Sequence, residues 1–410
     1  MSIKSINNSF CTYNKFKKSK LLISLDKIKI LYVVKHTLDI AKSGYTVRTN
    51  KVVQSFDNVA VILNPFFSQN KKYLNNSIKK DKGIINLYLT PSKIAELINN
   101  NNIKKIIIAS NGENFLKFYQ GMESLIPHFS KIHFTYEMRG LWFLSGLANA
   151  ELANTINMKL NYLLKEINKE RKSLELCHSV AFITPQLKDY VIKNFYSTTK
   201  FSKPNIIVPN GYDSLDSPIT PKNNPQGEFT IGYFGSITGY EGIDFLIQVC
   251  KTLIEDKGLN IKLKLIGKIS SNSCPESLTK KGGLLEEKFI FYKDWIEEKE
   301  LNNEFKDLNL FCIPRFPFTV CDVVSPLKPF KPLYHKVPLL MSDCDSLKDI
   351  SKNGKNCMLF KKGNLKDLEK KLYDIITKGY SPQLLENGYN YIINERDWKL
   401  IQNNYKNFIQ

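Results

Sequence analysis

The 410-residue sequence contains no long apolar run. No stretch approaches the roughly 18 consecutive apolar residues that a membrane-spanning helix needs. The apolar segment 21–25 near the N-terminus is too short and too interrupted for the core of a signal peptide. We therefore expect a cytoplasmic protein. If it contacts a membrane, it should do so peripherally on the inner face.

Several kinds of reactive centre are also missing. The eight cysteines form no C-x-x-C pair and no Cys/His cluster with the spacing of a zinc site. We expect reduced, mostly buried thiols and no bound metal. The sequence has no Walker motif, no nucleophile elbow and no H-E-x-x-H, the signatures of P-loop nucleoside triphosphatases, serine hydrolases of the α/β type and zinc proteases.

Acidic residues are scarce relative to basic ones. The chain has 59 Lys and Arg against 39 Asp and Glu, a formal charge of +20. Such an excess favours nucleic acid, anionic lipid headgroups or phosphorylated small molecules as partners. Much of it is lysine mixed with asparagine, as in residues 75–82, and no nucleic-acid-binding motif is present. We therefore expect no nucleic acid partner and keep an anionic membrane surface as a candidate.

The length and the turn-forming residues predict two domains. Residues 1–27 read as a polar extension, and residues 214–228, rich in Pro, Ser and Asn, read as a linker. Residues 28–213 and 229–380 would then form the N-terminal and C-terminal domains. The aromatic, helical segment 381–410 is expected to return to the N-terminal domain.

Short apolar runs alternate with helical patterns, which predicts two α/β domains, each built on a doubly wound parallel sheet. The longest helical pattern, residues 149–176, predicts one amphipathic helix that faces the core, with a membrane-lying helix as the less favoured alternative. Strands are expected at residues 29–34, 59–63, 84–89, 104–109, 131–136, 179–184, 229–235, 261–266, 289–292, 308–314 and 337–341, with a turn and a short strand at 354–360.

Each predicted domain has a glycine-bearing loop after its first strand. Ser43-Gly44-Tyr45 follows the first, and Gly235, Gly239 and Gly242 surround the second. Glycine lets backbone N–H groups approach a phosphate or a sugar. A plain tight turn explains one glycine equally well.

Charged residues follow two other predicted strands. Glu137 and Arg139 come directly after strand 131–136, where a ligand site competes with a surface ion pair as the explanation. Arg315 and Lys328 lie in the loop after strand 308–314, and a helix that begins near Ser325-Pro326 would add positive charge suited to a phosphate. The alternative is an ordinary βαβ connection with scattered surface cations.

The order and spacing of several motifs resemble one known family, the group 1 glycosyltransferases (family 4) with the GT-B fold. The resemblance runs from about residue 28 to 380. It implies two Rossmann-like domains that face each other across a cleft. It also implies retaining transfer from a nucleotide diphosphate sugar, a co-substrate, without a cofactor or a metal. The motifs are SGYT-x-R (43–48), YEMRGLW (136–142), VPNGYD (208–213), GYFGS (232–236), YEGID (240–244), PR-x-P (314–317) and SPLKPF (325–330).

The resemblance also assigns roles to residues. Arg315 and Lys328 would neutralise the leaving diphosphate, and Glu137 and Arg139 would face the acceptor or the transferred sugar. The nucleotide sugar would lie against Ser43, Gly44, Tyr45, Gly235, Ser236, Glu241, Asp322, Ser325, Pro326, Leu327 and Lys331.

One position departs from the family pattern. Lys331 stands where the family has a glutamate that holds the ribose hydroxyls, and a lysine cannot accept those hydrogen bonds. The earlier acidic position is kept only approximately, as Asp322. We expect a transferase of bacterial surface glycans such as capsule or lipopolysaccharide, with a saccharide or lipid-linked acceptor. The alternative is an inactive GT-B protein that serves as a glycan-binding or scaffold subunit.

Overall fold

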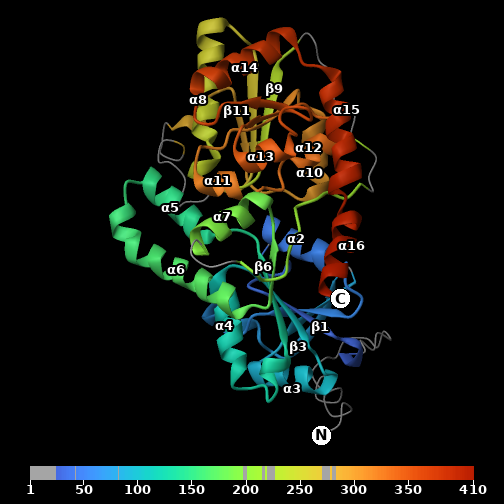
Figure 1. Ribbon diagram of the computed structural model, residues 1–410. Helices are drawn as coiled ribbons and strands as arrows, with labels where there is room; N and C mark the ends of the chain where they lie inside the picture. Colours follow the sequence, from blue (N-terminus) through green and yellow to red (C-terminus); the bar gives the residue numbers. More distant parts are fainter. Residues whose placement is uncertain are drawn as a thin grey trace.

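The computed structural model in Figure 1 describes residues 25–41, 43–81, 83–196, 201–214, 218, 227–269, 278 and 283–410. The predicted N-terminal extension lies outside these ranges except for its last three residues. Most of the predicted linker, residues 214–228, lies outside them as well. Both predicted domains lie largely within the described ranges.

An eight-stranded sheet forms the N-terminal domain, in the order β3-β4-β2-β1-β5-β6-β7-β8. Every pairing is parallel except that of β3 with β4. The polar edge strand β3 has no apolar alternation and was not predicted from the sequence. The strands are β1 (Ile30–Val34), β2 (Val59–Leu63), β3 (Ser77–Asp81), β4 (Ile84–Tyr88), β5 (Lys105–Ser110), β6 (His133–Met138), β7 (Ser179–Phe182) and β8 (Asn205–Ile207).

A six-stranded parallel sheet forms the C-terminal domain, in the order β11-β10-β9-β12-β13-β14. Together the two sheets confirm the predicted fold of two doubly wound α/β domains. The strands are β9 (Phe229–Phe234), β10 (Ile261–Ile266), β11 (Ile290–Lys293), β12 (Leu310–Ile313), β13 (Leu339–Ser342) and β14 (Met358–Phe360).

Helices connect the strands and cover the sheets (Figure 1). In the N-terminal domain they are α2 (Gly44–Val53), α3 (Pro91–Asn101), α4 (Gly112–Glu123), α5 (Trp142–Leu152), α6 (Ile156–Leu176) and α7 (Pro185–Phe195). In the rest of the chain they are α8 (Ile243–Lys257), α10 (Glu298–Lys306), α11 (Thr319–Val323), α12 (Phe330–Tyr334), α13 (Asp345–Ile350), α14 (Leu365–Lys378), α15 (Pro382–Tyr391) and α16 (Trp398–Ile409).

The single helix predicted over residues 149–176 is wrong, because the chain forms α5 and α6 with a turn between them. Asn154 in that turn has φ 54°, a left-handed conformation that asparagine tolerates better than most residues. The predicted core-facing side is also wrong for the first half of α6. There Leu163 is buried, whereas Leu160 and Leu164 are about half exposed.

The end of the chain divides between the domains. Helix α15 packs on the C-terminal domain, where Gly388 lies against Leu333 of α12. Helix α16 packs on the N-terminal domain, and the ring of its Tyr405 meets Phe56 edge-on at 5.5 Å. Figure 1 shows α16 running down beside α2 to the C-terminus. The last helix thus belongs to the core of the first domain.

In each sheet the strand order reverses next to the first strand of the domain. In the N-terminal sheet the reversal lies between β1 and β5, and in the C-terminal sheet between β9 and β12. Ligands of open α/β sheets bind outside the carboxyl ends of the strands at such a point. The loops after β1, β5, β9 and β12 are therefore the first places to look for a site.

One buried carboxyl group predicts how stability depends on pH. Glu170 of α6 accepts hydrogen bonds from the backbone N–H of Gly112 at 2.8 Å and from the Tyr136 hydroxyl at 2.6 Å. Burial raises the pKa of Glu170 to about 7. The folded protein therefore binds a proton more tightly than the unfolded chain between pH 4.5 and 7. The free energy of unfolding should fall by about 3 kcal/mol across this window as the pH rises.

Glu170→Gln should remove most of this contribution, since glutamine keeps a hydrogen-bonding group and does not titrate. Urea unfolding at pH 5 and pH 7.5 would measure it. The exposed α4 residue Glu123, changed to glutamine, is the matched control and should leave the pH dependence unchanged. An equal pH dependence in wild type and Glu170→Gln would contradict the assignment.

Candidate functional site

The carboxyl ends of β9 and β12 bring one carboxylate and two cations together. Glu241 ends the short turn Gly239–Glu241 in the loop after β9. Arg315 lies two residues beyond the end of β12, and Lys328 lies further along the same connection. All three are buried or nearly so, and all three belong to the predicted set of site residues.

Glu241 binds both cations at once. Its Oε1 atom accepts from Arg315 at 2.9 Å and from the Lys328 ammonium at 2.9 Å, and its Oε2 atom accepts from Arg315 Nε at 3.1 Å. Arg315 also donates to the backbone oxygen of Val324 at 3.0 Å. The geometry fixes the positions of both cations relative to the sheet.

The cluster of Glu241, Arg315 and Lys328 carries a net positive charge, because two cations share one carboxylate. The ion pairs outweigh burial and lower the pKa of Glu241 to about 2, so the carboxylate stays ionised. Burial lowers the pKa of Lys328, and the positive charge of Arg315 lowers it further. The negative charge of an incoming phosphate would favour the charged form of Lys328, whose side chain is the most exposed of the three at 15%.

Two glycines let the backbone close on this cluster. Gly235 has φ 144°, and a Cβ atom there would collide with Cε of Lys328. Gly242 has φ 71°, and a Cβ atom there would collide with the backbone oxygen of Pro314. A side chain at either position would push the loops after β9 and β12 apart. Ser236, next to Gly235, accepts a hydrogen bond at its backbone oxygen from the Tyr233 hydroxyl at 2.8 Å.

The segment before Lys328 rests on the N-terminal domain. Asn210 donates from Nδ2 to the backbone oxygen of Ser325 at 2.9 Å. A Cβ atom at Gly44 would lie 3.3 Å from Cδ1 of Leu327. Pro326, between them, is buried. The structure therefore brings the loop after β1 up to the C-terminal site, across the boundary between the domains.

Ser43, beside Gly44, accepts from the backbone N–H of Thr46 at 3.3 Å and so caps α2. Ser43 and Gly44 are exposed at the start of this helix. Tyr45 turns the other way, and its hydroxyl donates to the backbone oxygen of Ala109 at 3.4 Å inside the N-terminal domain. Of the three predicted residues, Ser43 and Gly44 are the ones that face the domain boundary.

The predicted helix start near Ser325-Pro326 does not form. Residues 324–329 are non-helical, and α12 begins at Phe330 and has five residues. Proline disfavours helical backbone in the residue before it, and this stretch has prolines at 326 and 329. Positive charge at the site therefore comes from the two side chains and not from a helix dipole.

Asp322 lies away from the cation cluster. Its Oδ1 atom accepts from the Lys362 ammonium at 2.6 Å and from the backbone N–H of Asp345 at 3.0 Å. It therefore stabilises the start of α13 and pairs with a partly exposed lysine. Its predicted place in the donor site stays a prediction.

Lys331, the residue that departs from the family pattern, is 8% exposed on α12. Its ammonium lies 5.5 Å from the ring centroid of Phe305 on α10. A cation over an aromatic ring is favourable, whereas a carboxylate at the same place would face the negative side of the ring. The surroundings of Lys331 are thus suited to the lysine.

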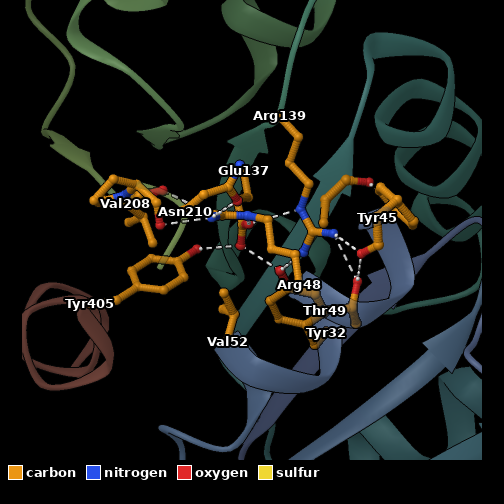
Figure 2. Close-up of polar contacts among 12 residues, drawn as sticks. Tyr32, Tyr45, Arg48, Thr49, Val52, Glu137, Arg139, Val208, Asn210 and Tyr405 are labelled. Atoms are coloured by element: carbon orange, nitrogen blue, oxygen red, sulfur yellow. Dashed lines mark hydrogen bonds and ion pairs between the residues drawn. The ribbon is translucent and has the colours of Figure 1, made fainter. Parts of the chain in front are cut away.

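Glu137 and Arg139 form a buried network and not a surface site (Figure 2). Glu137 is 1% exposed and accepts from Arg139 Nε at 2.9 Å, from Arg48 Nε at 3.3 Å and from the Tyr405 hydroxyl at 3.2 Å. It also accepts from the Tyr32 hydroxyl. Four groups of the protein thus surround the carboxylate of Glu137, and its role facing an acceptor stays a prediction.

Arg139 is held in the same network. It donates to the backbone oxygen of Tyr45 at 2.9 Å and to the Thr49 hydroxyl at 2.8 Å. Its guanidinium therefore contacts the interior of the N-terminal domain, and its acceptor-facing role likewise stays a prediction. The network joins α2, β6 and α16.

Arg48 extends this network toward the C-terminal site. It donates to the backbone oxygens of Val208 at 2.6 Å and Pro209 at 2.8 Å, and to Asn210 Oδ1 at 3.0 Å. Asn210 in turn holds Ser325. The motifs 43–48, 136–142 and 208–213 thus meet in space and position the segment that leads to Lys328.

Three residues at the carboxyl edge of the N-terminal sheet were not predicted as site residues. Lys35 follows β1, and its ammonium lies 4.9 Å from the Phe67 ring and 5.2 Å from the Trp142 ring. Trp142 is 46% exposed. Nδ1 of His36 is buried without a hydrogen-bond partner among the described residues. The sequence signal that could have identified them is their position directly after the predicted strands that became β1 and β6. Ligands of such sheets bind at the carboxyl ends of the strands.

The chain resembles solved structures along nearly its whole length. It matches a sucrose-phosphate synthase from Thermosynechococcus elongatus with a TM-score of 0.68 at 12% identity, covering 92% of this chain and 97% of the other. It matches Anabaena HepE in complex with UDP-glucose with a TM-score of 0.64 at 11% identity, covering 93% and 98%. The lipopolysaccharide outer core galactosyltransferase WaaB gives a TM-score of 0.60 at 13% identity, covering 93% and 99%.

At these identities the likeness establishes the fold alone. No curated protein matches the chain by sequence. Residues 228–378, however, match the family described as "Glycosyl transferases group 1", and this range contains Glu241, Arg315 and Lys328. The family predicted from the motifs is thereby confirmed. The C-terminal domain is thus similar to the group 1 glycosyltransferases, and the whole chain has the two-domain GT-B fold.

Proposed function

We propose that the protein is a retaining glycosyltransferase that moves a sugar from a nucleotide diphosphate sugar to a saccharide or lipid-linked acceptor. One observation supports this most strongly. The net positive cluster of Glu241, Arg315 and Lys328 lies at the switch point of the domain that matches the family.

The reaction breaks the bond between the anomeric carbon and the diphosphate oxygen. Negative charge grows on the diphosphate in the transition state, and Arg315 and Lys328 would stabilise it electrostatically. Glu241 holds both cations in position before the donor arrives. The acceptor hydroxyl would attack from the face that the diphosphate leaves, and a phosphate oxygen would take its proton. We expect the reaction to need neither a metal nor a cofactor besides the donor.

The acceptor would lie at the carboxyl edge of the N-terminal sheet, near Lys35 and Trp142. An exposed indole ring gives a sugar a flat apolar surface, and the ammonium beside it suits an acidic acceptor. HepE was solved with UDP-glucose, and WaaB acts on the lipopolysaccharide outer core by its title. These relatives support a role in bacterial surface glycan synthesis on the cytoplasmic side of a membrane.

A donor panel tests the proposal. The protein is incubated with UDP-, GDP-, ADP- and dTDP-sugars, and release of the nucleoside diphosphate is followed, with and without EDTA. We expect turnover of one donor class, unaffected by EDTA. The first sugar product should keep the anomeric configuration of the donor in proton NMR. An inverted product would contradict the retaining mechanism, and loss of activity with EDTA would contradict metal independence.

The second candidate function is an inactive scaffold or glycan-binding subunit. Lys331 is the residue that favours it, because it stands where the family has a glutamate. If the protein is a transferase, Lys331→Glu should raise the KM for the donor by about 10-fold, because a carboxylate replaces a buried cation near the site. The kcat should change less. If the protein is a scaffold, wild type should release no nucleoside diphosphate from any donor and Lys331→Glu should leave its biological function unchanged. A gain of transfer activity in this variant would argue against the scaffold.

A further inference from the structure

Exposed apolar side chains are concentrated on one part of the surface. Fourteen large apolar side chains are exposed among the described residues, and seven of them lie within residues 142–164. Such a concentration marks an interaction surface, whereas single exposed apolar residues are ordinary. The seven are Trp142, Leu152, Ile156, Met158, Leu160, Tyr162 and Leu164.

Helices α5 and α6 carry these residues on an arm that projects from the body of the protein, on the left of Figure 1. The second half of α6 packs inward through Glu166, Glu170 and Leu174. Leu163 closes the arm, and a Cβ atom at Gly146 of α5 would lie 3.3 Å from its Cδ2. Between residues 151 and 165, Leu163 is the one fully buried side chain. Residues 152–164 therefore form an exposed tip.

The tip is apolar on opposite sides. Residues two apart in an α-helix point about 200° away from each other, so Met158 and Tyr162 point away from Ile156 and Leu160. Met158 is 86% exposed and Tyr162 59%. A flat protein partner would cover one side of such a helix and leave the other in water. Asn157, Lys159 and Asn161 lie between the apolar side chains, so the tip suits the headgroup region of a bilayer, where apolar and polar surroundings meet.

The charged residues of the tip in α6 are lysines, whereas Glu151, exposed just before the tip at the end of α5, is acidic. Residues 153–165 contain Lys159 and Lys165 and no acidic residue. Glu166 and Glu170, which come next in α6, are buried against the body of the protein. A second copy of the chain would bring these lysines close to their own equivalents. Anionic headgroups would pair with the lysines. Their long side chains can extend to the headgroups while the helix axis lies deeper in the bilayer interface.

We propose that the tip, residues 152–164, inserts into the headgroup region of a bilayer that contains anionic lipid. Among the described residues, no helix combines the length and the apolar composition of a membrane span, so the arm would lie in the interface. Trp142, at the start of α5, would then stand close to the lipid surface, beside Lys35. This goes beyond the proposed transfer reaction, because it assigns the membrane contact to one arm. A lipid-linked acceptor would reach the N-terminal site from there.

Flotation of the full-length protein with lipid vesicles tests the insertion without any nucleotide sugar, so a failed donor assay cannot decide it. We expect binding to vesicles that contain phosphatidylglycerol and weaker binding to pure phosphatidylcholine. Met158→Ser with Leu160→Ser should weaken binding to both by at least about 10-fold. Lys159→Gln with Lys165→Gln should cost about 10-fold on the anionic vesicles alone.

Leu125→Ser with Leu400→Ser is the matched control, since these side chains are 39% and 44% exposed and lie outside the arm. The control should bind vesicles like wild type. Equal binding by wild type and the Met158/Leu160 variant would overturn the proposal. So would sedimentation of wild type as a dimer that this variant dissociates, because the tip would then contact a second copy.

Discussion

Lys328→Ala is expected to lower kcat/KM for the nucleotide sugar by about 100- to 1000-fold. The ammonium of Lys328 is the more exposed of the two cations that Glu241 holds, and removing one preorganised group that stabilises developing charge has an effect of this size. Most of the loss should appear in kcat, since the charge on the diphosphate grows in the transition state. Steady-state kinetics with the donor found in the panel would measure both constants.

Two variants control for indirect effects. Lys362→Ala removes a lysine that pairs with Asp322 outside the cluster, and its activity should stay within a few-fold of wild type. Arg315→Lys keeps the charge and gives up the paired hydrogen bonds to Glu241, so its activity should be intermediate. Activity of Lys328→Ala within three-fold of wild type would show that Lys328 does not stabilise the leaving group.

Glu137→Gln is expected to lower the free energy of unfolding by about 3–5 kcal/mol. The carboxylate lies between Arg48 and Arg139, and the variant would leave two buried guanidinium groups without their shared counter-charge. Because Arg48 also holds Asn210, and Asn210 holds Ser325, donor affinity should fall as well. Urea unfolding and nucleotide binding would measure the two effects.

The same substitution at an exposed ion pair is the control. Glu386 pairs with Lys336 at 2.7 Å, and its side chain is 52% exposed. Glu386→Gln should change the free energy of unfolding by less than about 1 kcal/mol. If Glu137→Gln is equally mild, the network does not hold the N-terminal domain together, and the acceptor-facing role of Glu137 would be favoured.

The sheets could be predicted because buried parallel strands are short apolar runs. Segments 59–63 and 261–266 were predicted with the bounds that the structure shows, and segment 229–235 ran one residue past the end of β9. Strand β3 (Ser77–Asp81) was missed, because it is a polar edge strand with three exposed residues, and only its antiparallel pairing with β4 defines it. A strand that is defined only by its pairing with a neighbour leaves no pattern of apolar residues in its own sequence.

The α5–α6 arm shows where periodicity misleads. Leucines three and four residues apart predicted a core-facing side, yet Leu160 and Leu164 lie beyond the part of α6 that packs on the body. How far a helix extends past its neighbours depends on the tertiary structure. The helix expected to begin near Ser325 does not form, for a local reason. Prolines at 326 and 329 disfavour helical backbone before them, and α12 begins only at Phe330.

The candidate site was predictable in part. In the sequence, Glu137 and Arg315 both stand at the end of an apolar run, so both were predicted to lie at a ligand site, although Glu137 is in fact inside β6. The partners that separate them are distant in sequence, since the Tyr405 hydroxyl that contacts Glu137 lies 268 residues away. The family resemblance correctly grouped Glu241, Arg315 and Lys328, because their motifs keep the spacing that two loops of one sheet require.

The most direct test of the central claim is a thermal-shift screen against UDP, GDP, ADP, dTDP and CMP, run on wild type and Lys328→Ala side by side. At a concentration 100-fold above its dissociation constant, one nucleoside diphosphate should stabilise wild type by about 3 kcal/mol. The shift should vanish in Lys328→Ala. If no nucleotide stabilises folded wild type, or if the variant shifts equally, the cluster of Glu241, Arg315 and Lys328 is not a diphosphate site.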